Sequence, residues 1–115
     1  ERIPDVRSLA ELVREAPDEA PWEKTGLLVA RFHREGLDHA DLNAHNVLYD
    51  ARGQGWLIDL DRSRMHIPAT AWRERNLQRL LRSLHKVAGE GQAASVDAGF
   101  ARLRKAYDAR WARGN

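Results

Sequence analysis

The sequence predicts an α+β domain that is predominantly helical and carries one small β-hairpin. Apolar residues recur at three- and four-residue spacing over four segments, which is the period of amphipathic helices. Two short β-prone runs flank a stretch of turn residues, which is the pattern of a hairpin. The length of 115 residues suits one domain, so residues 1–115 are expected to form a single unit.

Two helices are expected before the hairpin. Ser8 and Glu11 have the spacing of a capping box, so a short helix is predicted over residues 8–15. Pro21 suits the first position of a second helix, which is predicted over residues 21–35. This second helix leads directly into the most polar stretch of the chain.

The hairpin is predicted from two β-prone runs at residues 46–49 and 56–58. The residues between them are rich in Asp and Gly, and Asp50 is interpreted as a turn residue. Because the two strands of a hairpin run antiparallel, its outer ends near Asn46 and Asp59 should lie close together. The loop that precedes Asn46 is therefore expected beside Asp59.

Two more helices are predicted after a loop at residues 60–70. The first covers about 70–88 and the second about 94–112, with Gly89 and Gly91 between them. The apolar face of the first holds Leu77, Leu80, Leu81, Leu84 and Ala88, and that of the second holds Val96, Phe100, Leu103 and Tyr107.

The first of these helices also carries a basic stripe. Seven Lys or Arg residues and one acid, Glu74, occur between positions 62 and 86. Such a stripe is either a solvated face or a contact surface for an anionic partner, such as the cytoplasmic leaflet of a membrane. The formal net charge of only +2 gives no basis for a nucleic-acid partner. The stripe consists of Arg75, Arg79, Arg82 and Lys86.

The polar stretch at residues 39–62 reads HADLNAHNVLYDARGQGWLIDLDR and holds four Asp, two Asn and two His. Mg²⁺ binds oxygen ligands, usually one or two protein carboxylates together with substrate phosphates. A further carboxylate can accept the proton of an attacking hydroxyl. An Asn and an Asp that meet across a hairpin, with a second Asp nearby, therefore indicate phosphoryl transfer.

The segment HADLNAHN resembles the catalytic loop of kinases, H-R-D-x-x-x-x-N, and Asp59 in LIDLD stands in place of the metal-binding Asp of D-F-G. HADLNAHN followed by LIDLDR resembles most specifically the bacterial lipopolysaccharide-core sugar kinases of the Kdo kinase family. The resemblance covers the whole chain as the C-terminal lobe of a protein-kinase-like fold. It implies an enzyme that uses ATP and Mg²⁺ to phosphorylate the 3-deoxy-D-manno-octulosonic acid (Kdo) residue of Kdo-lipid A.

The resemblance also implies roles for individual residues. Asp41 is the implied catalytic base, and Asn46 and Asp59 are the implied Mg²⁺ ligands. Leu48 would lie beneath the adenine of ATP. Supporting or substrate-contacting roles are implied for His39, Asn43, His45, Asp61 and Arg62.

The two histidines of the loop have different expected roles. His39 is expected to pack and hydrogen-bond, as a structural residue of the loop. His45 is expected either to brace the loop or to touch the substrate.

Several positions depart from the protein-kinase pattern. Ala40 replaces the Arg that many protein kinases carry, Asn43 replaces a Lys, and Asp61 replaces the Gly of D-F-G. No A-P-E follows. These departures favour a small or lipid-linked sugar over a protein as the acceptor.

The ATP-covering half of a kinase is missing from the chain. It contains no G-x-G-x-x-G hairpin and no V-A-I-K lysine, and it begins at Glu1 rather than at Met. We therefore expect the C-terminal lobe of a longer kinase, inactive alone. By the same resemblance, it is expected in the cytoplasm, peripheral on the cytoplasmic face of the bacterial inner membrane. The absence of Cys excludes thiolate metal sites.

Three alternatives remain open. An aminoglycoside or other small-molecule phosphotransferase has a similar loop, H-G-D-x-x-x-x-N, although Ala40, and Asn43 where such enzymes often have His, favour the sugar kinase. His39-x-Asp41 also resembles two ligands of a 2-His-1-carboxylate iron site, which would require His66 or His85 as the third. A non-catalytic kinase-like scaffold leaves the spacing of the polar residues unexplained.

Overall fold

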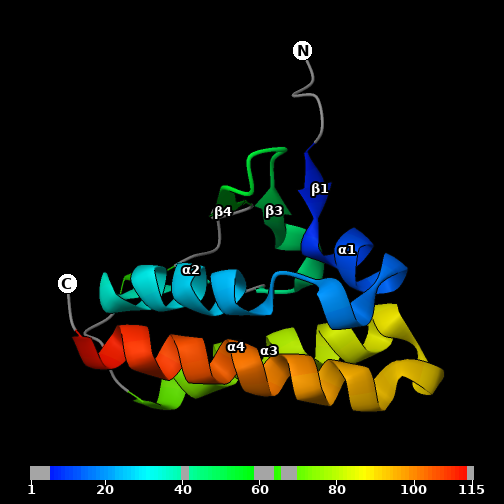
Figure 1. Ribbon diagram of the computed structural model, residues 1–115. Helices are drawn as coiled ribbons and strands as arrows, with labels where there is room; N and C mark the ends of the chain where they lie inside the picture. Colours follow the sequence, from blue (N-terminus) through cyan, green and yellow to red (C-terminus); the bar gives the residue numbers. More distant parts are fainter. Residues whose placement is uncertain (1–5, 40–41, 59–63, 66–69, 114–115) are drawn as a thin grey trace.

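The computed structural model describes residues 6–39, 42–58, 64–65 and 70–113. In Figure 1, α2 and α4 lie side by side, and a small sheet stands on the side of α2 away from α4. The predicted class is confirmed as a mostly helical domain with a small antiparallel sheet. The α-helices are α1 (Leu9–Glu15), α2 (Trp22–Arg34), α3 (Thr70–Ala88) and α4 (Ala93–Arg113). The sheet has the strand order β1 (Arg7–Ser8), β3 (Val47–Tyr49) and β4 (Gly55–Leu57).

The predicted capping box at α1 is confirmed. Ser8 Oγ accepts a hydrogen bond from Glu11 N at 3.1 Å, and Ser8 N donates to Glu11 Oε1 at 2.9 Å. These two bonds satisfy amide groups that the first turn of a helix leaves unpaired. Pro21 precedes α2 as its N-cap residue rather than serving as its first residue. Gly36, with φ +86°, supplies the left-handed conformation just after α2 that non-glycine residues adopt only with strain.

The predicted β-hairpin is also confirmed. β3 and β4 pair antiparallel, with Leu48 opposite Trp56. Asp50 is the turn residue that the sequence predicts, because its Oδ1 accepts hydrogen bonds from Arg52 N and Gln54 N at 2.9 and 3.0 Å.

Short strands that lie outside this hairpin were not predicted. β1 pairs with β3, and β2 (Leu37–Asp38) pairs with β5 (Arg64–Met65). The prediction of an uninterrupted loop over residues 60–70 is therefore wrong at β5. A strand of two residues has no periodicity to reveal it, and its pairing depends on a partner far along the chain. The remaining short elements are the 3₁₀ turns η1 (Pro17–Glu19), η2 (Ala44–Asn46) and η4 (Glu90–Gln92).

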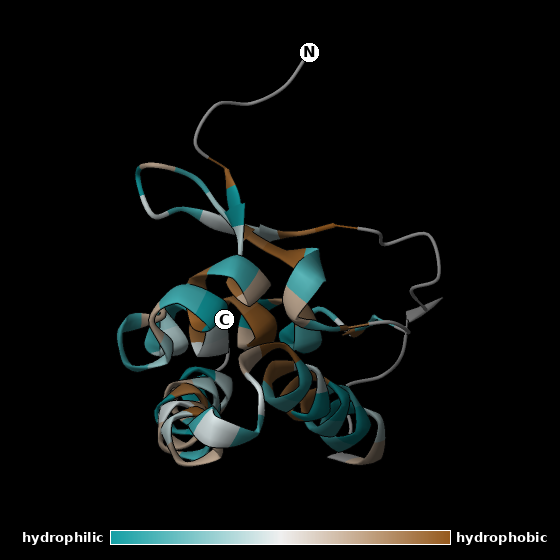
Figure 2. Cartoon of the chain, turned by 90° about the vertical axis from the view of Figure 1, so that its right-hand side faces the viewer, coloured by the Kyte–Doolittle hydropathy of each residue, from teal (hydrophilic) through white to brown (hydrophobic). Residues whose placement is uncertain are grey.

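Two glycines allow α2 and α4 to approach closely. A Cβ at Gly26 of α2 would lie 2.1 Å from the backbone oxygen of Leu103, and one at Gly99 of α4 would lie 2.0 Å from the Trp22 ring. The predicted apolar face of α4 is buried in full, whereas Leu81 and Ala88 of α3 are only partly buried. Figure 2 shows the apolar residues on the surfaces that the helices turn toward one another. None of the helices in the described part of the chain combines the length and apolarity needed to cross a membrane.

Candidate functional site

The polar loop lies between β2 and β3 and is tied to α3. Leu42 and Ala44 are buried, so their side chains anchor the loop in the core. Ala44 N donates a hydrogen bond to Ser83 Oγ of α3 at 2.8 Å. Asn43 Oδ1 accepts from His45 N at 2.8 Å and thereby caps the turn η2. The loop is thus held by apolar anchors, a contact to α3 and its own cap.

Both ends of this loop meet the backbone of Ile58, at the end of the hairpin. His39, at the entry, is buried, and its Nε2–H donates to the Ile58 carbonyl oxygen at 2.8 Å. Asn46, at the exit, accepts from Ile58 N through its backbone oxygen at 3.0 Å. His39 is thus buried and hydrogen-bonded, as expected of a structural residue of the loop. The outer ends of the hairpin therefore meet at Asn46 and Ile58, and Asp59, the next residue in the sequence, lies outside the described residues.

The predicted site residues are placed as follows. Asn46 is a buried side chain, Leu48 is half-buried in β3, and His45 is exposed. Asn43 is partly buried and serves as the cap of η2. Four predicted residues lie outside the described part of the chain, and their roles stay predictions: Asp41, Asp59, Asp61 and Arg62.

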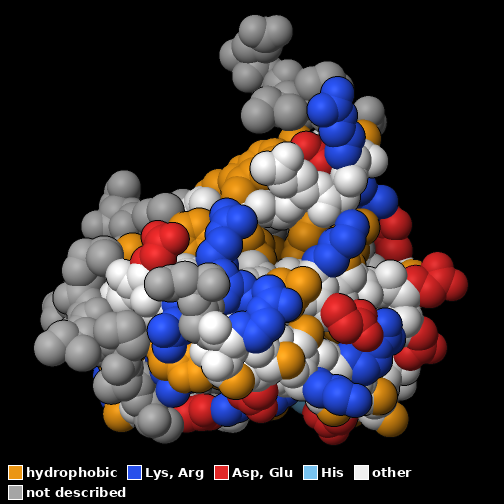
Figure 3. Space-filling view, turned by 60° about the vertical axis from the view of Figure 1, so that its left-hand side comes forward, with side chains coloured by type: hydrophobic (Ala, Val, Ile, Leu, Met, Phe, Trp, Pro, Cys, Tyr) orange, Lys and Arg blue, Asp and Glu red, His pale blue; other side chains and the backbone are white. Residues whose placement is uncertain are grey.

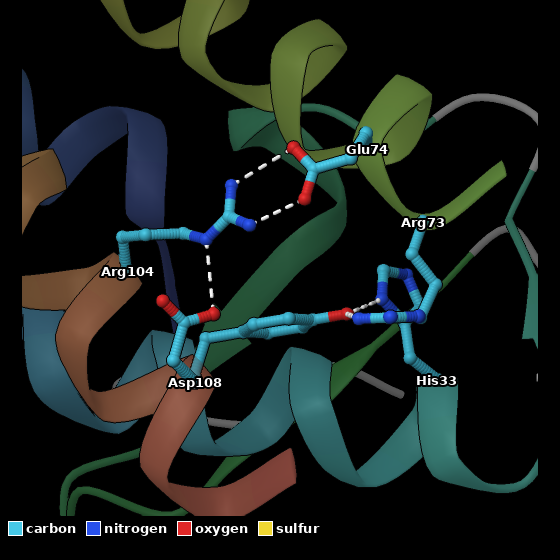
Figure 4. A network of polar contacts seen from close by, with 6 residues as sticks. His33, Arg73, Glu74, Arg104 and Asp108 are labelled. Atoms are coloured by element: carbon cyan, nitrogen blue, oxygen red, sulfur yellow. Dashed lines mark hydrogen bonds and ion pairs between the residues drawn. The ribbon is translucent and has the colours of Figure 1, made fainter. Parts of the chain in front are cut away.

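A buried polar network, which the sequence analysis did not predict, holds the residue that precedes His39 at the entry to the loop. Asn76 of α3 donates through Nδ2 to Asp38 Oδ1 at 2.8 Å, and Asp38 immediately precedes His39. The Asn76 amide oxygen therefore faces His33, whose Nε2–H donates to it at 3.2 Å. His33 Nδ1 then accepts from the Tyr107 hydroxyl at 2.7 Å (Figure 4). The sequence signals this network only by placing His33 and Tyr107 on the buried faces of their helices.

Cationic side chains complete the contacts between α3 and α4. Arg73 donates to the Tyr107 hydroxyl at 3.0 Å and lies 3.6 Å from the centroid of the Trp111 ring. Arg104 binds both carboxylate oxygens of Glu74 and donates to Asp108 (Figure 4). The Arg104 guanidinium holds the pKa of Glu74 below its usual range. Glu74, the one acid between positions 62 and 86, therefore forms an ion pair with Arg104 of α4.

The buried network makes His33 sensitive to acid. Burial lowers the pKa of His33 from 6.5 to about 4, so the neutral imidazole is the form that the fold accommodates. In the unfolded chain the ordinary pKa applies, and the unfolded state binds the proton first as the pH falls. We expect the free energy of unfolding to decrease between about pH 6.5 and pH 4, by on the order of 3 kcal/mol.

Urea titrations of the 115-residue chain at a series of pH values measure this effect. The control is His33→Gln, which lowers stability at neutral pH but should flatten the slope above pH 5, where most carboxylates stay ionised. A wild-type stability that does not change between pH 6.5 and 5, or an equal slope in the variant, would contradict the assignment.

The residues of the basic stripe on α3 line two separate hollows. Arg75, Arg79 and Arg82 line one of them, together with Glu74 and Gln78. Lys86 lines a different hollow, beside the polar loop. Figure 3 shows a further gathering of Lys and Arg with apolar side chains, on the face that carries the hairpin and the ends of α2 and α4.

The iron-site alternative gains no support from the contacts of the histidines. His39 Nε2 is bonded to Ile58, and His85 Nε2 is bonded to Asp97 Oδ1 at 2.8 Å. Within the described residues, no group of three or more His, Asp or Glu side chains has the placement of a metal site. Asp41 and His66, which this alternative names, lie outside the described part of the chain.

Comparison with known proteins shows a class of kinases. The sequence model of the lipopolysaccharide kinase (Kdo/WaaP) family matches residues 1–107. The chain belongs to this family, and the resemblance found in the sequence is confirmed.

Curated relatives agree with the family match. A protein named 3-deoxy-D-manno-octulosonic acid kinase from Stenotrophomonas maltophilia (strain K279a) is 64% identical over 114 residues, which are 99% of this chain and 46% of that protein. A protein of the same name from Xanthomonas axonopodis pv. citri (strain 306) is 61% identical over the same shares. The chain therefore spans about half the length of the curated relatives it matches.

Proposed function

We propose that the protein to which this chain belongs is an ATP-dependent kinase that phosphorylates the Kdo residue of Kdo-lipid A. Family membership and the names of the relatives support a kinase of this class. The observation that carries the proposal is the meeting of His39, Asn46 and Ile58, because it joins the two halves of the kinase-like motif. In this proposal the 115-residue chain is the catalytic lobe and transfers no phosphate by itself.

The donor set fits a Mg²⁺ ion. Asn46 is a buried residue at the end of η2, and its backbone oxygen accepts a hydrogen bond from Ile58 N. Ile58 directly precedes Asp59 in the sequence. Amide and carboxylate oxygens are ligands that Mg²⁺ accepts alongside nucleotide phosphates. We assign Asn46 and Asp59 as the residues that hold it. When bound, the ion neutralises charge on the transferring phosphoryl group.

The remaining residues of the site position the two substrates. Asp41 accepts the proton of the attacking sugar hydroxyl, since a carboxylate near that oxygen is the general base that such a transfer uses. Leu48 forms the apolar floor beneath the adenine. Asp61 and Arg62 contact the substrate or support the metal ligands, and Asn43 keeps the loop closed through its cap on His45.

Removal of a metal ligand tests the nucleotide site. In the longer protein, Asp59→Ala should weaken the binding of Mg²⁺-ATP at least about 10-fold, because the ion loses a carboxylate ligand. Isothermal titration calorimetry measures it. Asp18→Asn, on the exposed turn η1, is the control and should bind as the wild type does. Equal affinity of Asp59→Ala and wild type would contradict the assignment and favour a different site.

We also propose that the protein works in the cytoplasm, peripherally on the inner membrane, where the basic stripe contacts anionic lipid. Arg75 and Arg82 are exposed, Arg79 is partly exposed, and Glu74 beside them is engaged with Arg104. A basic residue near an anionic bilayer contributes about 1 kcal/mol of binding free energy. The stripe residues are Arg75, Arg79, Arg82 and Lys86.

Charge reversal tests this contact. The longer protein with Arg75→Glu and Arg79→Glu should bind anionic liposomes at least about 10-fold more weakly at low salt. Co-sedimentation measures it, and neutral liposomes serve as the control. Equal binding of variant and wild type, or binding that salt does not weaken, would exclude the stripe as the contact surface.

A further inference from the structure

A second feature of the polar loop is a hollow of about 530 Å³ that opens on its outer side. Asn43 and His45 of the loop line one wall, Arg14 of α1 lines another, and Ser83 and Lys86 of α3 line a third. Elements far apart in the sequence thus meet here, since α1, η2 and α3 are all in mutual contact.

The walls of this hollow are held in place by hydrogen bonds. Ser83 Oγ accepts from Ala44 N at 2.8 Å, which fixes the loop against α3. The cap between Asn43 and His45 N fixes the turn that presents the His45 side chain. The hollow therefore has preformed walls on the loop side and does not depend on an unsupported segment.

The chemistry of the hollow is cationic. Arg14 and Lys86 are exposed, and neither forms an ion pair with a carboxylate among the described residues. Within the described lining there is no Asp or Glu. A guanidinium, an ammonium and an imidazole without an acidic partner are complementary to a carboxylate or a phosphate.

The hollow also lies close to the implied reaction centre. Asn43 follows Asp41 by two residues, and two residues of extended chain span about 7 Å at most. An anionic group bound in the hollow would therefore place a hydroxyl of the same sugar, or of its neighbour, within reach of Asp41.

We propose that Arg14, His45 and Lys86 form an anion-binding subsite that holds a carboxylate or phosphate of the phosphoryl acceptor and so positions its hydroxyl. This inference rests on the proposed function, assigns His45 to the acceptor and adds two further residues that contact it. These two, Arg14 and Lys86, lie outside the kinase-like motif.

Steady-state kinetics of the longer protein test the subsite. Arg14→Gln and Lys86→Gln should each raise the KM for the acceptor about 10-fold, because a charge-assisted hydrogen bond is lost, and leave the KM for ATP within about twofold. Lys105→Gln, an exposed position of α4, is the matched control. The proposal is overturned if the acceptor KM changes no more than in this control, or if the KM for ATP rises instead.

Two modified acceptors distinguish the source of the anion. If a sugar carboxylate occupies the hollow, the difference between wild type and Lys86→Gln disappears on an acceptor whose carboxylate is reduced to an alcohol. If a lipid phosphate occupies it, the difference disappears on a dephosphorylated acceptor instead. A difference that persists on both would refute the subsite.

Direct binding separates the subsite from the proposed reaction. Inorganic phosphate should shift the imidazole NMR signals of His45 saturably in the wild-type protein, and not in Arg14→Gln or Lys86→Gln. This shift without any phosphate transfer to a Kdo acceptor would retain the subsite and refute the proposed function. Transfer with an unchanged acceptor KM in both variants would retain the function and refute the subsite.

Discussion

Replacement of Gly26 by alanine should lower the free energy of unfolding of the 115-residue chain by about 2 kcal/mol, as the net of an overpacking cost of about 3 kcal/mol and a smaller gain in helix propensity. The new Cβ would lie 2.1 Å from the Leu103 carbonyl oxygen and 3.0 Å from Tyr107 N. Both atoms belong to the α4 backbone and cannot rotate away, so α2 and α4 must separate. The intrinsic preference of helices for alanine, about 1 kcal/mol, offsets only part of this cost.

Urea unfolding measures this effect, and Gly91→Ala is its matched control. A Cβ at Gly91 meets no atom within 4 Å, so its stability should stay within about 0.5 kcal/mol of the wild type. If Gly26→Ala were as stable as Gly91→Ala, the close packing of α2 on α4 would be wrong. Leu103, whose carbonyl oxygen lies against Gly26, would then have to pack differently.

Replacement of Asp41 by asparagine has the largest expected effect on activity. In the longer protein, kcat for transfer to the Kdo acceptor should fall about 1,000-fold, within the range that a general base contributes. Asparagine keeps the size and the hydrogen-bonding oxygen of the side chain but cannot take up the proton. The KM for ATP should change little, because the nucleotide is assigned to Asn46, Leu48 and Asp59.

The matched control is Asp50→Asn, in the turn of the same stretch. Asp50 uses one oxygen to accept from two backbone amides, and an asparagine oxygen can do the same. Its kcat should therefore stay close to the wild-type value. If the kcat of Asp41→Asn lay within about threefold of the kcat of this control, Asp41 would not be the general base, because a general base contributes at least about 100-fold.

The helices could be predicted because their signals are local. The spacing of Ser8 and Glu11 specified the start of α1, and the apolar periodicity of α4 named the residues that are buried. The short strands depend on distant pairing: Arg7 lies opposite Tyr49, and Leu37 lies opposite Met65. No local pattern reveals a two-residue strand of this kind.

The candidate site likewise has parts that local sequence signals predict and parts that depend on contacts between distant residues. The motif located the loop, and the structural role expected for His39 agrees with its bond to Ile58. The network of His33 and Tyr107 joins residues 74 positions apart, and each of them looks like an ordinary core residue in the sequence. Arg14 likewise reaches the loop only because α1 packs against α3. Both the contact between His33 and Tyr107 and the position of Arg14 beside the loop depend on tertiary packing, which no local sequence pattern encodes.

The most direct test of the central claim is the analysis of the reaction product. Kdo-lipid A is incubated with ATP, Mg²⁺ and the longer protein. The mass of the Kdo fragment of the lipid is then measured by mass spectrometry. A gain of one phosphoryl group on that fragment is expected with the wild-type protein, and none with Asp41→Asn. An unmodified Kdo fragment from a wild-type protein that binds Mg²⁺-ATP would contradict the central claim.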